Sequence, residues 1–282
     1  MSVEMRGDWL FGSTNDAGGH FSGPYGLQLY SLRQQLPGHV KRWLEQVRQA
    51  GYQEVEMASL DNLSAQQFHR ALQSAGLRCV GMHNDYARYV RQMPAIIREA
   101  QTLGAEYLVC PDLPQAGRHL TMADVRRAAR DFNRFAAQLE RHGLHFGFHA
   151  EVNAFYPIGG RPGLDRLIAL LRPDIVQEMD IFWYTCGGEN PVAYLKRYPK
   201  LFRLMHLKDM RRGTPVGASR AEFPVPSAGE ACVPLGQGIL DMPAILHEAV
   251  RIGVQHYFVE DESREAPKNI VKDINYLKTV RV

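Results

Sequence analysis

Six short apolar segments of the sequence each carry two ionisable residues that are two positions apart. The pairs are Glu54 and Glu56, His83 and Asp85, His149 and Glu151, Glu178 and Asp180, His206 and Lys208, and Glu260 and Glu262. Successive side chains of a β-strand point to opposite faces, so both members of each pair lie on one face. Carboxylates and imidazoles bind divalent metals and transfer protons. The spacing therefore predicts strands with one apolar face and one face that ends in metal-binding or acid–base groups.

Such strands need a fold that brings their polar ends together. Five helical patterns end in a glycine and are followed within three residues by a β-rich run, at Gly51, Gly76, Gly104, Gly143 and Gly253. A glycine just past a helix supplies the left-handed conformation that closes it, and a strand so soon afterwards means a tight loop. With three further β-rich stretches at 25–33, 174–183 and 201–210, eight strands are expected to start near residues 25, 53, 78, 106, 145, 175, 202 and 256.

Eight strands that alternate with helix-length segments predict an α/β fold of the (β/α)8 TIM barrel type, with a parallel sheet inside and helices outside. No G-x-G-x-x-G follows a strand, which argues against a dinucleotide-binding sheet. Long loops such as 153–163 and 209–238 follow strands and would form the barrel mouth, where active sites lie. An unpaired charge that faced the outer helices would be very costly. The paired polar residues are therefore expected to face the barrel axis near its mouth.

Composition excludes several classes of protein. The chain has 282 residues, 45% of them hydrophobic and 22% charged, with a net charge of +3 and scattered basic residues, so neither a nucleic-acid partner nor a membrane is expected. Four widely spaced cysteines indicate reduced thiols rather than a disulfide framework. Residues 1–24 lack the pattern of a signal peptide and read as a flexible arm. We expect one barrel domain over residues 25–282 and a cytoplasmic protein.

Four strand ends are expected to converge as a metal site, formed by Glu151, Asp180, His206 and Glu260. An ion pair explains any single one of these residues equally well, and isolated histidines such as His145 and His256 read as structural. For the four together, a divalent cation is the better explanation because it neutralises carboxylates that would otherwise repel. Three oxygen ligands and one nitrogen suit Mn²⁺, Mg²⁺ or Co²⁺, with Zn²⁺ as an alternative.

Six motifs in order resemble the xylose isomerase-like TIM-barrel superfamily, in its sugar phosphate isomerase/epimerase branch. They are GLQLYSLR (26–33), GYQEVEM (51–57), EMDIFWYTCGGENP (178–191), MHLKDM (205–210), PLGQGILDMPAIL (234–246) and VEDESREAP (259–267). The resemblance implies one metal held by Glu, Asp, His and Glu from strands five to eight, and it matches Asp180, His206 and Glu260. Relatives often read His-Asn-His-Asp-x-Glu-Phe where this chain has residues 149–155. The fifth-strand ligand is therefore Glu151, favoured by strand parity, or His149.

The resemblance implies a metal-dependent isomerase or epimerase that acts on a sugar or keto-sugar. A proton next to a carbonyl is removed through a metal-stabilised enediolate, with Glu151 and Glu260 as the acid–base pair. His83, His149 and Lys208 are candidates for contacts with substrate oxygens, and Trp183 for packing against a sugar face. Phe155 and Tyr30 are further candidates for such packing, although packing in the core or at the rim explains each of the three aromatic residues somewhat better.

Three alternatives remain at this stage. A dehydratase, as in the related inosose dehydratases, would share the intermediate and lose water. An abasic-site endonuclease on the same barrel would need more histidine ligands for several zinc ions and a basic DNA-binding face, and the sequence shows neither. A non-catalytic sugar-binding barrel that has lost its metal is the third alternative, and the altered fifth strand gives it some support. Phosphate on the substrate and assembly into a homo-oligomer are left open.

Overall fold

Eight parallel strands close into a barrel in the computed structural model, which describes residues 19–117, 119–217 and 227–282. The strands are β1 (Tyr25–Gln28), β2 (Glu54–Met57), β3 (Arg78–His83), β4 (Tyr107–Cys110), β5 (His145–His149), β8 (Val176–Asp180), β9 (Phe202–Leu207) and β12 (His256–Val259). Each pairs in parallel with its neighbours in chain order, and β12 pairs with β1 to complete the ring. All eight strands begin within one residue of the expected positions, which confirms the predicted (β/α)8 fold.

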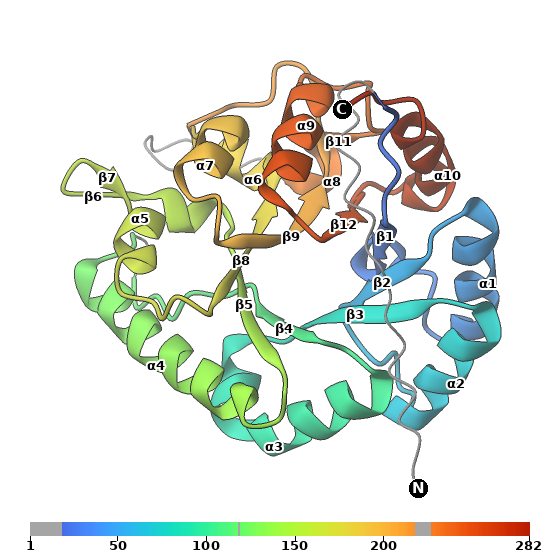
Figure 1. Cartoon of the computed structure of the whole chain (residues 1–282), viewed down its shortest axis with the longest axis horizontal. Helices are drawn as coiled ribbons and strands as arrows, with labels where there is room; N and C mark the ends of the chain where they lie inside the picture. Colours follow the sequence, from blue (N-terminus) through green and yellow to red (C-terminus); the bar gives the residue numbers. More distant parts are fainter. Residues whose placement is uncertain (1–18, 118, 218–226) are drawn as a thin grey trace, which may run out of the picture.

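Helices surround this barrel (Figure 1). They are α1 (Val40–Ala50), α2 (Ala65–Ala75), α3 (Tyr86–Leu103), α4 (Met122–Glu140), α5 (Gly163–Ile168), α6 (Ile181–Cys186), α7 (Pro191–Arg197), α8 (Ala228–Ala231), α9 (Met242–Ile252) and α10 (Ala266–Leu277), with the 3₁₀ helices η1 (Leu29–Leu32) and η2 (Val152–Phe155) after β1 and β5. Gly51, Gly76, Gly104 and Gly253 close α1, α2, α3 and α9 in the left-handed conformation. Four of the five glycine signals thus mark helix ends, as predicted. The fifth differs, because α4 ends at Glu140 with Arg141 as its C-cap, and Gly143 adopts a positive φ in the turn before β5.

The interior of the barrel changes from apolar to ionisable along its axis. Val80, Tyr107, Val109, Leu204 and Phe258 form a buried cluster inside the ring of strands. Gly26 of β1 faces this cluster, and a Cβ there would lie 2.4 Å from the Phe258 ring, so only glycine fits. The ionisable side chains of β2, β8 and β9 that follow are buried on the same inner face, which confirms the parity argument.

Residues that precede β1 pack against β1 and β12 and pair with the C-terminal end of the chain. Phe21 is buried against the rings of Tyr25 and Tyr257, and its N–H donates to the Val280 carbonyl at 2.8 Å. Residues 1–18 of the predicted arm lie outside the described residues. At the start of β12, His256 Nδ1 lies 2.8 Å from a Glu54 carboxylate oxygen, which fits the structural role predicted for this histidine.

The Asp209 carboxylate holds together the two ends of the long segment that follows β9, because it accepts hydrogen bonds from the turn at 236–238. Two short strands, β10 (Asp209–Met210) and β11 (Cys232–Val233), pair antiparallel beside the mouth, and a second hairpin is formed by β6 (Pro157–Ile158) and β7 (Arg161–Pro162). The Asp209 carboxylate accepts backbone N–H groups from Gly236 and Gly238 at 2.9 and 3.0 Å. A Cβ at Gly238 would lie 2.2 Å from Asp209 Oδ1, so the turn requires glycine.

The four cysteines are unpaired and buried, as the sequence predicts. Across the described ranges, none of the helices has the length and apolar character needed to cross a membrane.

Asp273 of α10 is expected to make stability depend on pH. Its Oδ1 accepts the Leu235 N–H at 2.8 Å, and burial, with smaller contributions from Asp261 and Asp209, raises its pKa from 3.8 to about 8. Between these values the folded protein holds a proton that the unfolded chain has lost. Stability should therefore fall as pH rises through this range, by at most about 1.4 kcal/mol per pH unit. Asp273→Asn should flatten the dependence of Tm on pH from 5 to 8, and equal slopes in the two proteins would contradict this assignment.

Candidate active site at the barrel mouth

A cavity of about 360 Å³ opens at the C-terminal ends of the strands. Its lining comes from loops and strand ends around the barrel: Tyr30, Ala58, His83, Asn84, Asp85, Pro111, His149, Glu151, Trp183, Glu260 and Glu262. A concave site with several converging polar groups at this end of a (β/α)8 barrel is the expected place for a small-molecule site. The cavity lining includes His83, His149, Trp183, Glu151 and Glu260, five of the eight residues predicted from the sequence to contact substrate or bind metal.

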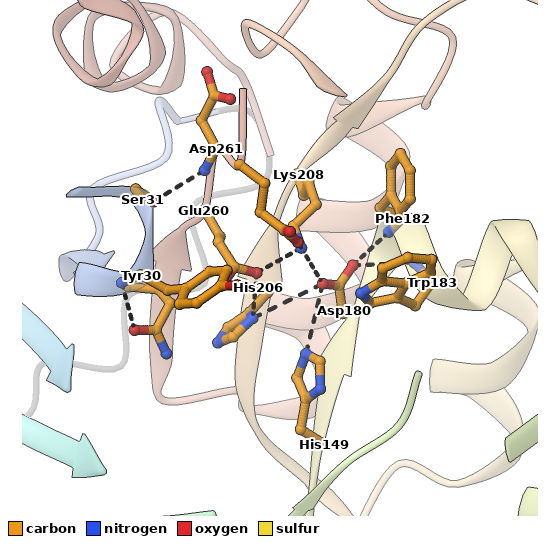
Figure 2. Close-up of polar contacts among 12 residues, drawn as sticks. Tyr30, Ser31, His149, Asp180, Phe182, Trp183, His206, Lys208, Glu260 and Asp261 are labelled. Atoms are coloured by element: carbon orange, nitrogen blue, oxygen red, sulfur yellow. Dashed lines mark hydrogen bonds and ion pairs between the residues drawn. The ribbon is translucent and has the colours of Figure 1, made fainter. Parts of the chain in front are cut away.

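Four buried side chains meet at the cavity floor, and we call them the upper group. His149, Asp180, His206 and Glu260 each offer a nitrogen or oxygen atom, and these atoms all lie within 4.8 Å of one another. Three stand on β5, β8 and β9, and Glu260 directly follows β12. The predicted metal ligands Asp180, His206 and Glu260 are thus brought together. Figure 2 shows them with His149 around the Asp180 carboxylate.

The two oxygens of Asp180 have different environments. Oδ1 accepts the backbone N–H groups of Phe182 and Trp183 at 2.8 and 3.1 Å and so caps α6. Oδ2 faces the centre of the upper group, 3.5 Å from His149 Nε2 and 2.9 Å from Lys208 Nζ. Burial alone would raise the pKa of Asp180, but Lys208 and His149 together outweigh it and lower the pKa. Asp180 therefore presents a charged oxygen from a fixed helix terminus.

Lys208 is a buried cation held by three carboxylates. Its Nζ lies 2.9 Å from Asp180, 2.6 Å from Glu260 and 2.7 Å from Glu262, and the side chain is 1% exposed. Burial lowers the pKa of Lys208, yet these carboxylates raise it well above its usual value, so it stays charged. The role predicted for Lys208, contact with a substrate oxygen, would require its ammonium to leave at least one carboxylate. Its position also shows that Asp180 and Glu260 attract a cation.

Glu151 lies outside the upper group. Strand β5 ends at His149, and the chain turns into η2 three residues later, so Glu151 keeps the side of the strand that parity assigns but stands at the rim. The residue is exposed, and it lines the cavity. His149, the other fifth-strand candidate, takes the place in the group. Glu151 as a ligand stays a prediction that this geometry does not favour.

A second set of ionisable residues lies beside the upper group, and we call it the lower group: Glu56, His83, Glu178 and His206. His206 belongs to both, with Nδ1 3.1 Å from Glu260 and Nε2 2.7 Å from Glu56. His83, predicted as a substrate contact, lies 2.8 Å from Glu178 and also lines the cavity. Glu56 and Glu178 were not among the predicted site residues, although both occupy the polar parity of β2 and β8 and could have been found by it.

The three aromatic candidates for contact with a sugar differ in how exposed their side chains are. Trp183 is half-buried and lines the cavity, as does Tyr30, which is 41% exposed. Phe155 is buried and packs edge-on against Tyr184, so it belongs to the core. Trp183 and Tyr30 are the two aromatic rings placed to meet a bound molecule.

The upper group suits a divalent metal. Neither ring nitrogen of His149 has a hydrogen-bond partner within the described residues, although the side chain is almost wholly buried. Buried polar atoms are normally hydrogen-bonded, so a buried imidazole that makes no hydrogen bond and whose Nε2 lies 3.5 Å from Asp180 Oδ2 indicates a ligand position. Two imidazoles and two carboxylates suit Zn²⁺, Mn²⁺ or Co²⁺, a more nitrogen-rich set than the three-carboxylate set expected from the sequence.

Comparison with known proteins agrees with this architecture. Residues 44–280 match the family model described as xylose isomerase-like TIM barrel. A sugar phosphate isomerase/epimerase from Parabacteroides distasonis superimposes with a TM-score of 0.76 at 22% identity, over 92% of this chain and 99% of that one. The IOLI protein with a binding zinc atom gives 0.70 at 14% identity, over 90% and 95%. The probable 3-DHS dehydratase AsbF from Bacillus anthracis gives 0.69 at 12%, over 90% and 98%. None of the curated proteins matches the sequence.

Proposed function

Because the chain belongs to the xylose isomerase-like TIM barrel family, we propose that it is a metal-dependent isomerase or epimerase of a sugar or keto-sugar. The observation that carries this proposal is the upper group, whose four buried ligand atoms lie within 4.8 Å of one another beneath a cavity of about 360 Å³. A divalent metal held by His149, Asp180, His206 and Glu260 would supply Lewis-acid stabilisation of the negative charge that develops on a substrate oxygen. The structural neighbours support the same class of chemistry by analogy of fold.

Proton transfer needs a carboxylate that is free to reach the substrate. Glu151 lines the cavity outside the upper group. Although the residue as a whole is exposed, the protein atoms around its carboxylate partly desolvate it, and this raises its pKa. A carboxylate of raised pKa is a stronger base. Burial would also raise the pKa of Glu260, but Lys208 and His206 hold it well below normal, so Glu260 acts better as a ligand than as a base. We therefore assign the first proton transfer to Glu151 and keep Glu260 as its predicted counterpart.

The remaining cavity residues would bind and orient the sugar. Trp183 and Tyr30 offer apolar ring surfaces, and His83 and Asn84 offer polar groups to hydroxyls. A few placed polar groups against an apolar wall is the usual composition of a small-molecule site. Together they would hold the carbon that loses its proton within reach of Glu151.

Deuterium exchange tests the reaction class before the substrate is known. Purified protein with Mn²⁺ is incubated in D₂O with a panel of keto-sugars and inososes, and the products are examined by NMR and mass spectrometry. Exchange of a proton next to the carbonyl supports the proposal, and its absence across the panel contradicts it. Product mass separates the alternatives, because an isomerase leaves the unlabelled mass unchanged and a dehydratase, the class named for one structural neighbour, removes water.

Two fifth-strand variants should separate ligand from base. Glu151→Gln is expected to retain metal while the exchange rate falls about 10²–10⁴-fold, because it removes only the proton acceptor. His149→Gln is expected to weaken metal binding, since it removes a buried imidazole from the upper group. Metal content after dialysis and the exchange rate are measured for both. Loss of metal from Glu151→Gln would reverse the assignment.

A further inference from the structure

The lower group has a shortage of positive charge. Glu56 on β2 and Glu178 on β8 are both 0% exposed, and each has one oxygen, Oε1, without a hydrogen-bond partner in the part of the chain that the structure describes. An isolated buried carboxylate is very costly unless a cation or several donors compensate it. Within the same described residues, neither carboxylate forms an ion pair with a lysine or an arginine; the ion pairs that they form are with His83 and His206.

Glu54 provides an internal comparison. It lies two residues before Glu56 on the same strand and the same inner face, and it is 4% exposed. Unlike Glu56, it forms an ion pair with Arg78 as well as its contact with His256. Burial on this face of β2 is therefore compatible with a permanent counter-ion. At Glu56 and Glu178 the only counter-ions that the described residues supply are imidazoles, which can release a proton and bind a metal instead.

The geometry of the lower group meets the requirements of a metal site. Its four ligand atoms come from four different strands and lie within 4.8 Å of one another. His83 Nε2 lies 2.8 Å from Glu178 and 3.2 Å from Glu56, and His206 Nε2 lies 2.7 Å from Glu56. Gln28 Nε2 donates to the same Glu56 oxygen at 2.7 Å and so orients this carboxylate. His83 also lines the mouth cavity, which gives an ion a path from solvent.

We propose that Glu56, His83, Glu178 and His206 form a second divalent-cation site, one layer below the upper group. His206 serves both sites, with Nδ1 toward Glu260 and Nε2 toward Glu56. When both sites are filled, its ring would release its remaining N–H proton to solvent and bridge the two cations as an imidazolate. Two carboxylates and two imidazoles select a transition metal such as Zn²⁺, Mn²⁺ or Co²⁺ over Mg²⁺ or Ca²⁺, which prefer oxygen ligands alone. In the metal-free protein the imidazoles carry the compensating charge. Burial lowers the pKa of His83, but Glu56 and Glu178 raise it to about 10.

Metal stoichiometry tests this site without reference to activity. The full chain is stripped with a chelator, dialysed against a series of Mn²⁺ or Zn²⁺ concentrations, and analysed for metal per chain. Wild type should bind two equivalents at saturation. Glu178→Gln should bind one, because it removes a charged ligand of the lower group only. Saturation of wild type at one equivalent or fewer would overturn the proposal, as would two equivalents in Glu178→Gln.

Further variants keep the result interpretable. His83→Asn removes another ligand of the lower group, at its half-buried edge, and should also bind one equivalent of metal. It provides the same test if Glu178→Gln folds poorly. Glu54→Gln, the matched control on the inner face of β2, should keep two. Asp180→Asn should lose the upper equivalent and keep the lower one, so a failed upper site and a failed lower site give different results. Thermal unfolding with and without metal shows whether each variant is folded.

Discussion

Asp180→Asn is expected to lose metal from the upper group and to lower kcat by about three orders of magnitude. Loss of a side chain that merely orients a metal ligand already costs about 10–100-fold in affinity, so loss of a charged ligand should cost at least about 100-fold. Lewis-acid stabilisation is worth several kcal/mol in the transition state, which corresponds to about 10³-fold in rate. Metal affinity by equilibrium dialysis and the rate of deuterium exchange check the two effects separately.

The substitution is suited to this position because it can preserve the cap of α6. The Asn side-chain oxygen can take the place of Oδ1, which accepts the N–H groups of Phe182 and Trp183 and caps α6. What changes is the second atom, where an amide N–H₂ replaces the charged Oδ2 that faces Lys208 and His149. Asp180→Ala would remove the cap as well, at an additional cost of about 0.5–2 kcal/mol in stability.

Asp241→Asn is the matched control. Asp241 also caps a helix, through the Ala244 N–H at 3.1 Å at the start of α9, but its carboxylate belongs to neither ligand group. It should keep wild-type metal content and rate. If Asp180→Asn kept both, the upper group would not be the metal site, and the proposed chemistry would have no electrophile.

The fold could be read from the sequence because its signals are local. A glycine that closes a helix and the alternation of faces along a strand depend on a few neighbouring residues, and each is repeated around the barrel. Gly51 and Gly253, for example, close α1 and α9 as expected. Strand parity likewise placed Asp180 and His206 on the inner face, where both are 0% exposed.

The fifth-strand position could not be settled in this way. Parity assumes that the extended chain continues, but β5 ends at His149, and two residues further on Glu151 has reached the rim. Where a strand ends depends on its pairing with β8, which reaches only to His149, opposite Glu178. That limit is set by a segment almost 30 residues away in sequence. Strand parity could predict which face of the sheet Glu151 lies on, but not how far along the barrel axis it lies.

The sequence also could not predict which ionisable side chains contact one another. His206 lies on β9 and Lys208 directly follows the end of that strand, and the alternating pattern predicted both at the site. Only the closed barrel shows that Lys208 contacts Asp180, Glu260 and Glu262, while Glu56 and Glu178 have imidazoles instead. Which carboxylates form ion pairs with Lys208 depends on the stagger of the strands around the barrel.

Lys208→Met should strongly destabilise the metal-free protein. The substitution keeps a side chain of similar length but removes the only charge that contacts Asp180, Glu260 and Glu262 together among the described residues. Removal of one partner from a buried ion pair costs about 3–5 kcal/mol, because the remaining charges are left without compensation. For a chain of this size, the expected fall in Tm is on the order of 10 °C. Thermal unfolding in the presence of a chelator measures it.

Divalent metal should restore most of this loss. A cation bound by Asp180 and Glu260 would supply the charge that the lysine no longer gives, so the gap in Tm between variant and wild type should narrow at saturating Mn²⁺. Lys268→Met is the control, since Lys268 pairs with Glu265 on the surface, where both side chains are more than 60% exposed, and such pairs contribute about 0–1 kcal/mol. A metal-free Lys208→Met protein as stable as wild type would show that Lys208 does not compensate the carboxylates. A gap that Mn²⁺ leaves unchanged would show that metal and ammonium do not act on the same carboxylates, which would move the metal away from Asp180 and Glu260.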